Sequence, residues 1–120
     1  MEKEIVIEII NCKISGTMLG IEDHGILSAF VYLEWPSAGI GFGGYGLDGM
    51  GGKKPSKACG LFVRSVLEVI GVSDWEKLKG QPCRVKIEGG WGGRAVALGN
   101  FMEEKWFAPK EAFAALKGDE

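Results

Sequence analysis

The sequence predicts an α+β domain: a mostly antiparallel sheet of about five strands, one main packed helix and a short C-terminal helix. Segments with alternating apolar residues fill the first half of the chain and return after residue 82, and one long segment with helical apolar spacing separates them. The 120 residues contain no internal repeat and no linker, so we expect a single domain over 1–120. The pattern fits an open sheet as well as one curled into a barrel.

The first two strands form a predicted hairpin. Residues 4–10 alternate and are rich in β-branched side chains, and residues 14–21 continue the strand after a bend near Asn11. Residues 22–25 (EDHG) supply turn residues, and residues 26–35 follow as the second strand.

Glycine is the unusual component, with 20 of 120 residues against a usual share of roughly 7%. It is concentrated in residues 39–47, GIGFGGYGL, where Ile40, Phe42, Tyr45 and Leu47 still mark a strand. A strand with so many glycines is predicted to be bulged or closely approached by another group.

A helix over 57–70 follows the loop 48–54. Ser56 can cap its N-terminus, and Gly71 fits the position after its C-terminus. Its apolar stripe, which we expect to pack across the sheet, consists of Phe62, Val63, Val66, Leu67 and Ile70.

The last third returns to strands. Residues 73–76 (SDWE) match a capping box and start a short helical turn, which Gly80 ends. Residues 83–88 alternate as a half-buried strand, the loop 89–93 (GGWGG) makes a hairpin, and residues 94–101 run back.

The C-terminal residues leave the sheet in this prediction. Trp106 and Phe107 return to the apolar surface. Pro109 then starts a short helix in which Phe113 and Leu116 face the core.

The cysteines do not suggest a disulfide framework or a metal site. Cys12, Cys59 and Cys83 are widely spaced, and there is only one histidine. We therefore expect buried reduced thiols, no metal and no cofactor.

Charge and hydropathy suggest a cytoplasmic protein that is not a cationic nucleic-acid binder. The formal net charge is −2. The sequence has no signal-peptide pattern, and its apolar runs are far shorter than the roughly 20 residues needed to span a bilayer.

No catalytic motif is complete. A Walker A loop fails because Lys54 follows Gly52 and Lys53, and because Leu47 occupies the position of the first glycine. Two Gly-x-Gly-x-x-Gly matches in residues 39–46 lack the strand–turn–helix context of a dinucleotide site. His24 has no serine in a nucleophile elbow to act on. We predict no catalytic residue.

Two features suggest binding instead. Lys53, Lys54 and Lys57 lie at the predicted start of the helix, where anions are favoured, although a solvated basic loop explains them as well. Trp91 stands between two glycine pairs and close to Arg94. An exposed indole beside a cation is typical of a site that stacks on a ligand or binds a partner; the alternative is that the indole folds back over the sheet.

The predicted binding surface joins the glycine-rich segment 39–54 to the hairpin 89–93, because glycine exposes backbone N–H groups and contributes no packing. A homodimer is an alternative use of the same face. The predicted residues of this binding surface are Phe42 and Tyr45 on its floor, Gly43 and Gly44 beside them, Lys53 and Lys54 to bind a negatively charged group, and Trp91 and Arg94 as the anchor.

Several blocks in this order resemble a family of small uncharacterised bacteriophage and prophage proteins. These blocks are EDHGIL (22–27), GFGGYGLD (41–48), LFVRSVLEVIGV (61–72), WEKLKG (75–80) and WFAPKE (106–111), within a resemblance from about Gly16 to Phe113. The segment between Asp48 and the helix is shorter in this sequence than in the members of that family. The resemblance implies a phage gene product acting in the bacterial cytosol and carries over no catalytic residue.

The favoured function is therefore a non-enzymatic counter-defence binding protein, which inhibits a host defence protein or sequesters a small anionic or nucleotide ligand. The alternative is a nucleic-acid-associated accessory module of phage DNA metabolism. Binding that weakens steeply with salt would favour the alternative.

Overall fold

The computed structural model describes residues 6–22, 25–47, 57–89 and 93–118. The elements in order are β1 (Ile7–Ile21), β2 (Leu27–Trp35), β3 (Ala38–Gly46), α1 (Lys57–Ile70), the 3-10 turn η2 (Trp75–Lys77), β4 (Pro82–Glu88), β5 (Arg94–Asn100), β6 (Trp106–Phe107) and α2 (Pro109–Gly118).

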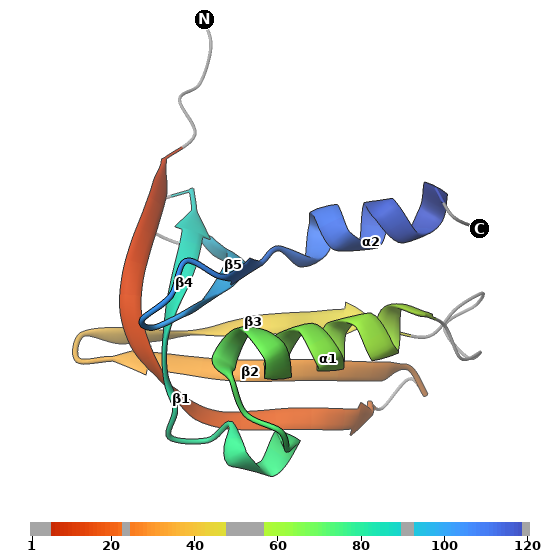
Figure 1. The fold of residues 1–120 in the computed structure, drawn as a ribbon, viewed down its shortest axis with the longest axis horizontal. Coiled ribbons are helices and arrows are strands. Elements are labelled where there is room, and N and C mark those ends of the chain that lie inside the picture. The colour runs from red at the N-terminus through yellow and green to blue at the C-terminus, as the bar shows by residue number, and fades with distance from the viewer. Residues whose placement is uncertain (1–5, 23–24, 48–56, 90–92, 119–120) are drawn as a thin grey trace, which may run out of the picture.

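The six strands form one antiparallel sheet in the order β3-β2-β1-β4-β5-β6, which is not closed into a barrel (Figure 1). The predicted α+β class is confirmed. The strand that the sequence did not predict is β6, whose two residues pair with Leu98 and Gly99.

A long, bent first strand organises the sheet. Residues 7–13 of β1 pair with β4, whereas residues 13–21 pair with β2. The register shifts between Ile14 and Gly16, a few residues beyond the bend expected at Asn11. Figure 1 shows β1 running down one side of the molecule and then turning under the other strands. A three-stranded half (β3, β2 and β1) and a four-stranded half (β1, β4, β5 and β6) therefore share β1 and enclose the core between them.

Three phenylalanines join the two halves. Phe42 on β3, Phe62 on α1 and Phe107 on β6 have ring centroids 5.7–6.1 Å apart. Phe42 and Phe62 are stacked, and Phe107 meets both rings edge-on. The outermost strands of the sheet are thus held through a single aromatic cluster.

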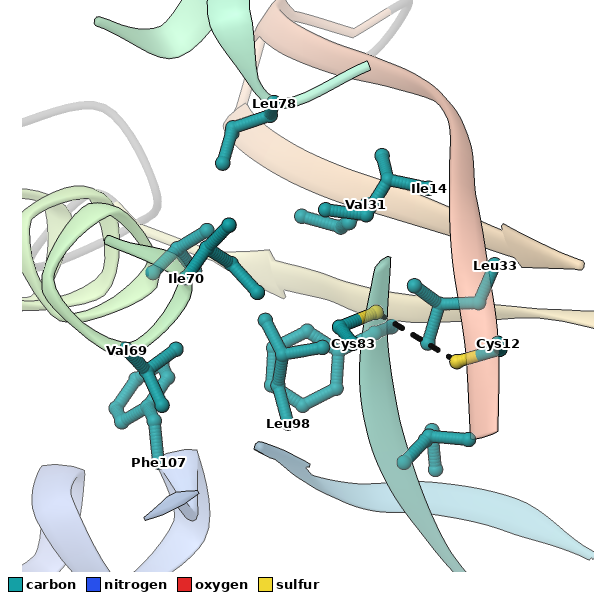
Figure 2. Close-up of a cluster of buried hydrophobic side chains, with 14 of the residues drawn as sticks. Cys12, Ile14, Val31, Leu33, Val69, Ile70, Leu78, Cys83, Leu98 and Phe107 are labelled. Carbon is teal, nitrogen blue, oxygen red and sulfur yellow. Dashed lines mark hydrogen bonds between the residues drawn. The ribbon is translucent and has the colours of Figure 1, made fainter. Parts of the chain in front are cut away.

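The rest of the core lies between α1 and the concave side of the sheet (Figure 2). Figure 2 shows side chains from α1, β1, β2, β4 and β5 converging on one another. The fully buried members include Ile14, Val31, Leu33, Val66, Leu78, Cys83, Val85 and Leu98.

Helix α1 has the predicted bounds, and its apolar stripe is confirmed in part: Val63 and Leu67 are only half-buried, and Val69, which was not predicted, is buried. Phe62, Val66 and Ile70 are buried. Gly71 has a φ of 92°, and its N–H donates to Leu67 O at 2.8 Å, which completes the expected C-terminal cap. On the opposite face, Arg64 and Glu68 form an exposed ion pair.

The capping box predicted for residues 73–76 is wrong. Asp74 is the N-cap of η2, and no side chain caps this turn. The turn is held instead by Trp75, which packs against the core.

Two cysteines face each other across β1 and β4. Cys12 and Cys83 are directly paired in the register, and their Sγ atoms lie 3.5 Å apart in a thiol–thiol hydrogen bond (Figure 2). This hydrogen bond and burial raise the pKa of the Cys83 thiol. Both thiols are free and buried, as the sequence predicted, whereas Cys59 is only half-buried.

Val66→Asp should destabilise the domain by about 3 kcal/mol or more, because it puts an unpaired carboxylate into the core at a fully buried position. The measurement is chemical denaturation of both proteins. Gly60→Asp on the same helix is the matched control, since a Cβ there meets nothing within 4 Å. A Val66→Asp protein as stable as the control would show that α1 does not pack through this face.

Candidate functional site

An open groove of about 740 Å³ lies between β5 and α2. Residues 94–97 of β5 form one wall, and α2 contributes the other. The lining residues are Ile7, Lys86, Glu88, Arg94, Ala95, Val96, Ala97, Trp106, Ala108, Lys110, Glu111, Phe113 and Ala114.

The groove exists because β6 is short. β6 pairs with β5 only at Leu98 and Gly99, and Pro109 then starts α2, which leads the chain away from the sheet (Figure 1). Proline lacks an N–H and cannot continue a strand ladder. Residues 94–97 of β5 therefore have β4 on one side and no described strand on the other.

The charges of the groove are mixed, with a small positive excess. Lys86, Arg94 and Lys110 stand against Glu88 and Glu111, three cations against two carboxylates. Within the described ranges, neither Arg94 nor Lys110 forms an ion pair or a side-chain hydrogen bond. Both cations are exposed and available to a negatively charged group.

Trp106 forms the end of the groove and is tightly held. Its ring lies against Gly99, where a Cβ would come within 2.6 Å of the indole. The Lys86 Nζ lies 4.3 Å and the Arg84 Cζ 4.7 Å from the ring centre, both within cation–π range. Trp106 Nε1 donates to Glu104 at 3.2 Å. The indole is fixed by its own chain.

The loop between β5 and β6 supports that tryptophan. The Asn100 side chain accepts from the N–H groups of Met102 and Glu103 and donates to Val69 O at the end of α1, at 2.8–2.9 Å. Arg84 donates to Glu104 at 2.9 Å. Hydrogen bonds from Arg84 and from Trp106 lower the pKa of the Glu104 carboxyl.

The glycine-rich strand has a structural explanation. Phe30 and Tyr32 alternate with the core residues of β2 and stack at 5.5 Å on the outer face of the sheet. Phe30 lies over Gly41 and Gly44, and a Cβ on Gly44 would overlap its ring. The glycines leave room for aromatic side chains of the same chain.

A bulge accompanies these glycines, as predicted. The register of β2 with β3 shifts at Ala29 and Phe30, opposite Gly43 and Gly44, which have φ values of 109° and 78°. A Cβ on Gly43 would lie 2.5 Å from Ala29 O, so only glycine fits there.

The predicted site residues are not brought together by the described part of the chain. Phe42 is fully buried in the core, which takes it away from the expected floor of a binding surface. Gly43 and Gly44 face Phe62 and Phe30, and neither lines the groove.

Arg94 is the predicted residue that lies in the groove. Lys53, Lys54, Trp91 and the side chain of Tyr45 lie outside the described residues.

Sequence reasoning missed most of the groove. Lys86, Trp106, Lys110 and Phe113 line it, yet Trp106 was interpreted only as apolar surface and Phe113 only as core. The sequence WFAP at 106–109 was the available signal for a short strand: two residues with high β-propensity are followed closely by a proline, which ends the strand.

No group of three or more potential metal ligands occurs among the described side chains. In the same part of the chain, no helix is long and apolar enough to cross a membrane. No family model matches the chain, and comparisons with curated proteins and with solved structures likewise find no match.

Gly44→Ala should destabilise the protein by about 2 kcal/mol or more, because the new methyl group overlaps the Phe30 ring at a positive φ. Thermal and chemical denaturation measure the loss. Gly20→Ala is the control: a Cβ on Gly20 meets nothing within 4 Å, so its stability should stay within about 1 kcal/mol of wild type. Equal stability of the two variants would contradict the structural role of Gly44.

Glu104→Gln should lower the melting temperature at neutral pH and lose this effect in acid. A lowered folded-state pKa stabilises the fold above the ordinary glutamate pKa of about 4.3, and this contribution disappears as pH falls through the lower folded value. Melting curves of both proteins from neutral pH to about pH 2 test this. A constant difference between them at every pH would contradict the assignment.

Proposed function

We propose that this chain is a phage-encoded, non-enzymatic binding protein that inhibits a host defence protein by docking it in the groove between β5 and α2. The observation that carries the proposal is the groove itself, where an open strand wall faces α2, with Arg94 on the strand and Lys110 on the helix both unpaired among the described residues. The phage setting comes from the resemblance of the sequence blocks. The cytosol of the host is the compartment that this setting implies.

The chemistry of the groove favours a protein partner over a nucleotide. A nucleotide site usually offers a free aromatic face for the base and a concentrated positive charge for the phosphates. Trp106 is packed against Gly99 and covered by Arg84 and Lys86, so its ring is already engaged. Two carboxylates interrupt the positive charge. Mixed charge beside apolar surface is typical of a protein interface.

The same features weigh against the nucleic-acid module. Binding of a nucleic acid backbone relies on a continuous basic groove. Here Lys86, Arg94 and Lys110 share the groove with Glu88 and Glu111, and the whole chain carries a net charge of −2.

Affinity capture with matched baits tests the proposal. Wild-type protein, Arg94→Glu and Lys110→Glu are compared with Lys79→Glu, an exposed lysine outside the groove. We expect a bacterial protein to be recovered with wild type and Lys79→Glu, and about tenfold less of it with either groove variant. Melting curves confirm that all four baits are folded.

Three results would overturn the proposal. Equal recovery of the partner with all four baits would place the interface elsewhere on the molecule. A stoichiometric nucleotide in the purified protein, or DNA binding that falls steeply with salt, would favour the small-ligand or the nucleic-acid function.

A further inference from the structure

We infer that the docked partner supplies an extended, acidic segment that adds as a strand to the open edge of β5. This inference rests on the proposed function and specifies the chemistry of the same groove. The segment would occupy the groove in line with β6, beside residues 94–97, and continue the antiparallel order of the sheet.

The open edge is the first reason. In a strand, N–H and C=O groups point alternately to the two neighbouring positions, so residues 94–97 direct half of theirs away from β4. Over these residues, none of the described part of the chain pairs with that side. Unpaired backbone groups at a strand edge are a template for an added strand, which gains main-chain hydrogen bonds along its length.

The position of α2 is the second reason. It forms the wall opposite β5 and presents Phe113 and Ala114 as apolar surface and Lys110 as a cation. A strand laid along β5 would alternate its side chains, so one set could contact this helix. Grooves between a strand edge and a helix suit extended peptides, because backbone bonds supply affinity and the helix selects side chains.

Charge complementarity decides the character of the segment. Arg94 at the start of β5 and Lys110 at the start of α2 are both exposed and unpaired among the described residues, and the groove carries one cation more than it has carboxylates. Acidic side chains on the added strand would be attracted to these cations, whereas basic ones would be repelled.

A second copy of this chain fits less well. The other edge strand of the sheet, β3, has the sequence AGIGFGGYG, which contains no acidic residue to pair with Arg94 or Lys110. Pairing β5 with its own copy would bring the arginine into a strand of like charge. The observations therefore favour a different chain with acidic side chains.

The test is selection from a random peptide display library on immobilised wild-type protein, with Lys110→Glu as the counter-selection. We expect selected peptides to be rich in aspartate and glutamate, to alternate acidic with apolar residues and to lack internal proline. Their affinity should fall about tenfold or more on Arg94→Glu or Lys110→Glu and stay unchanged on Lys79→Glu.

Backbone chemistry separates strand addition from simple charge attraction. The best peptide is resynthesised with N-methyl groups on alternate residues, in the two possible phases. One phase should lose binding about tenfold or more, and the other should keep it, because only one set of amides faces β5. Amide hydrogen exchange on the complex should show new protection within residues 94–97.

The outcomes distinguish the two proposals. A library that yields no peptide, peptides without acidic residues, or equal binding of both methylated phases would overturn strand addition. If the host protein is still captured through Arg94 and Lys110 in that case, the proposed function stands without it. If capture ignores both cations, the groove itself is the wrong surface.

Discussion

Ile14 is fully buried, and directly after it the backbone of β1 bulges and turns, which lets one strand serve both halves of the sheet. The Ser15 hydroxyl donates to Tyr32 O at 3.2 Å, while the backbone of Ile14 exchanges hydrogen bonds with residues 80 and 81. A straight β1 would leave the two halves in one flat layer with a single exposed apolar face. The bend encloses that face, and α1 then closes it through Phe62 and Val66.

Glycine and aromatic residues act as pairs on the outer face of this sheet. Phe30 lies over Gly41 and Gly44, and Trp106 lies against Gly99. An aromatic ring that lies over a glycine covers backbone of the neighbouring strand that no side chain would otherwise cover. The ring and the glycine backbone are both packed as a result. This arrangement accounts for the glycine-rich strand without a ligand. It also fixes Trp106 at the end of the groove, where a freely rotating indole would fill the space.

The groove arises where strand pairing stops. Pro109 ends β6 after two residues, and the open part of β5 then faces α2 instead of another strand. Lys86, on β4, reaches the same groove from beside Trp106. The lining residues belong to β1, β4, β5, β6 and α2, which the pairing of the strands brings together. The residues of the groove therefore do not form a motif within one stretch of the sequence.

Local patterns determined the elements of this protein. The stripe of α1, the cap at Gly71, the alternation in β4 and the bulge at the glycine-rich strand all follow from steric and hydrophobic preferences that act over a few residues, and the structure shows each of them. The sequence also singled out Arg94, as the neighbour of Trp91 in a stacking site, and the structure places it in the groove between β5 and α2.

Only the tertiary structure decided which residues share a surface. Phe42 alternates like an outward residue of a glycine strand, yet the curl of the sheet turns it onto Phe62 and Phe107. The hairpin of β4 and β5 follows from a local pattern, but the pairing of β5 with β6, which brings Lys110 to the groove that holds Lys86 and Arg94, is specified by no local pattern. Strand order and curl arise from contacts between distant segments, and the spacing of residues along one segment carries no information about them.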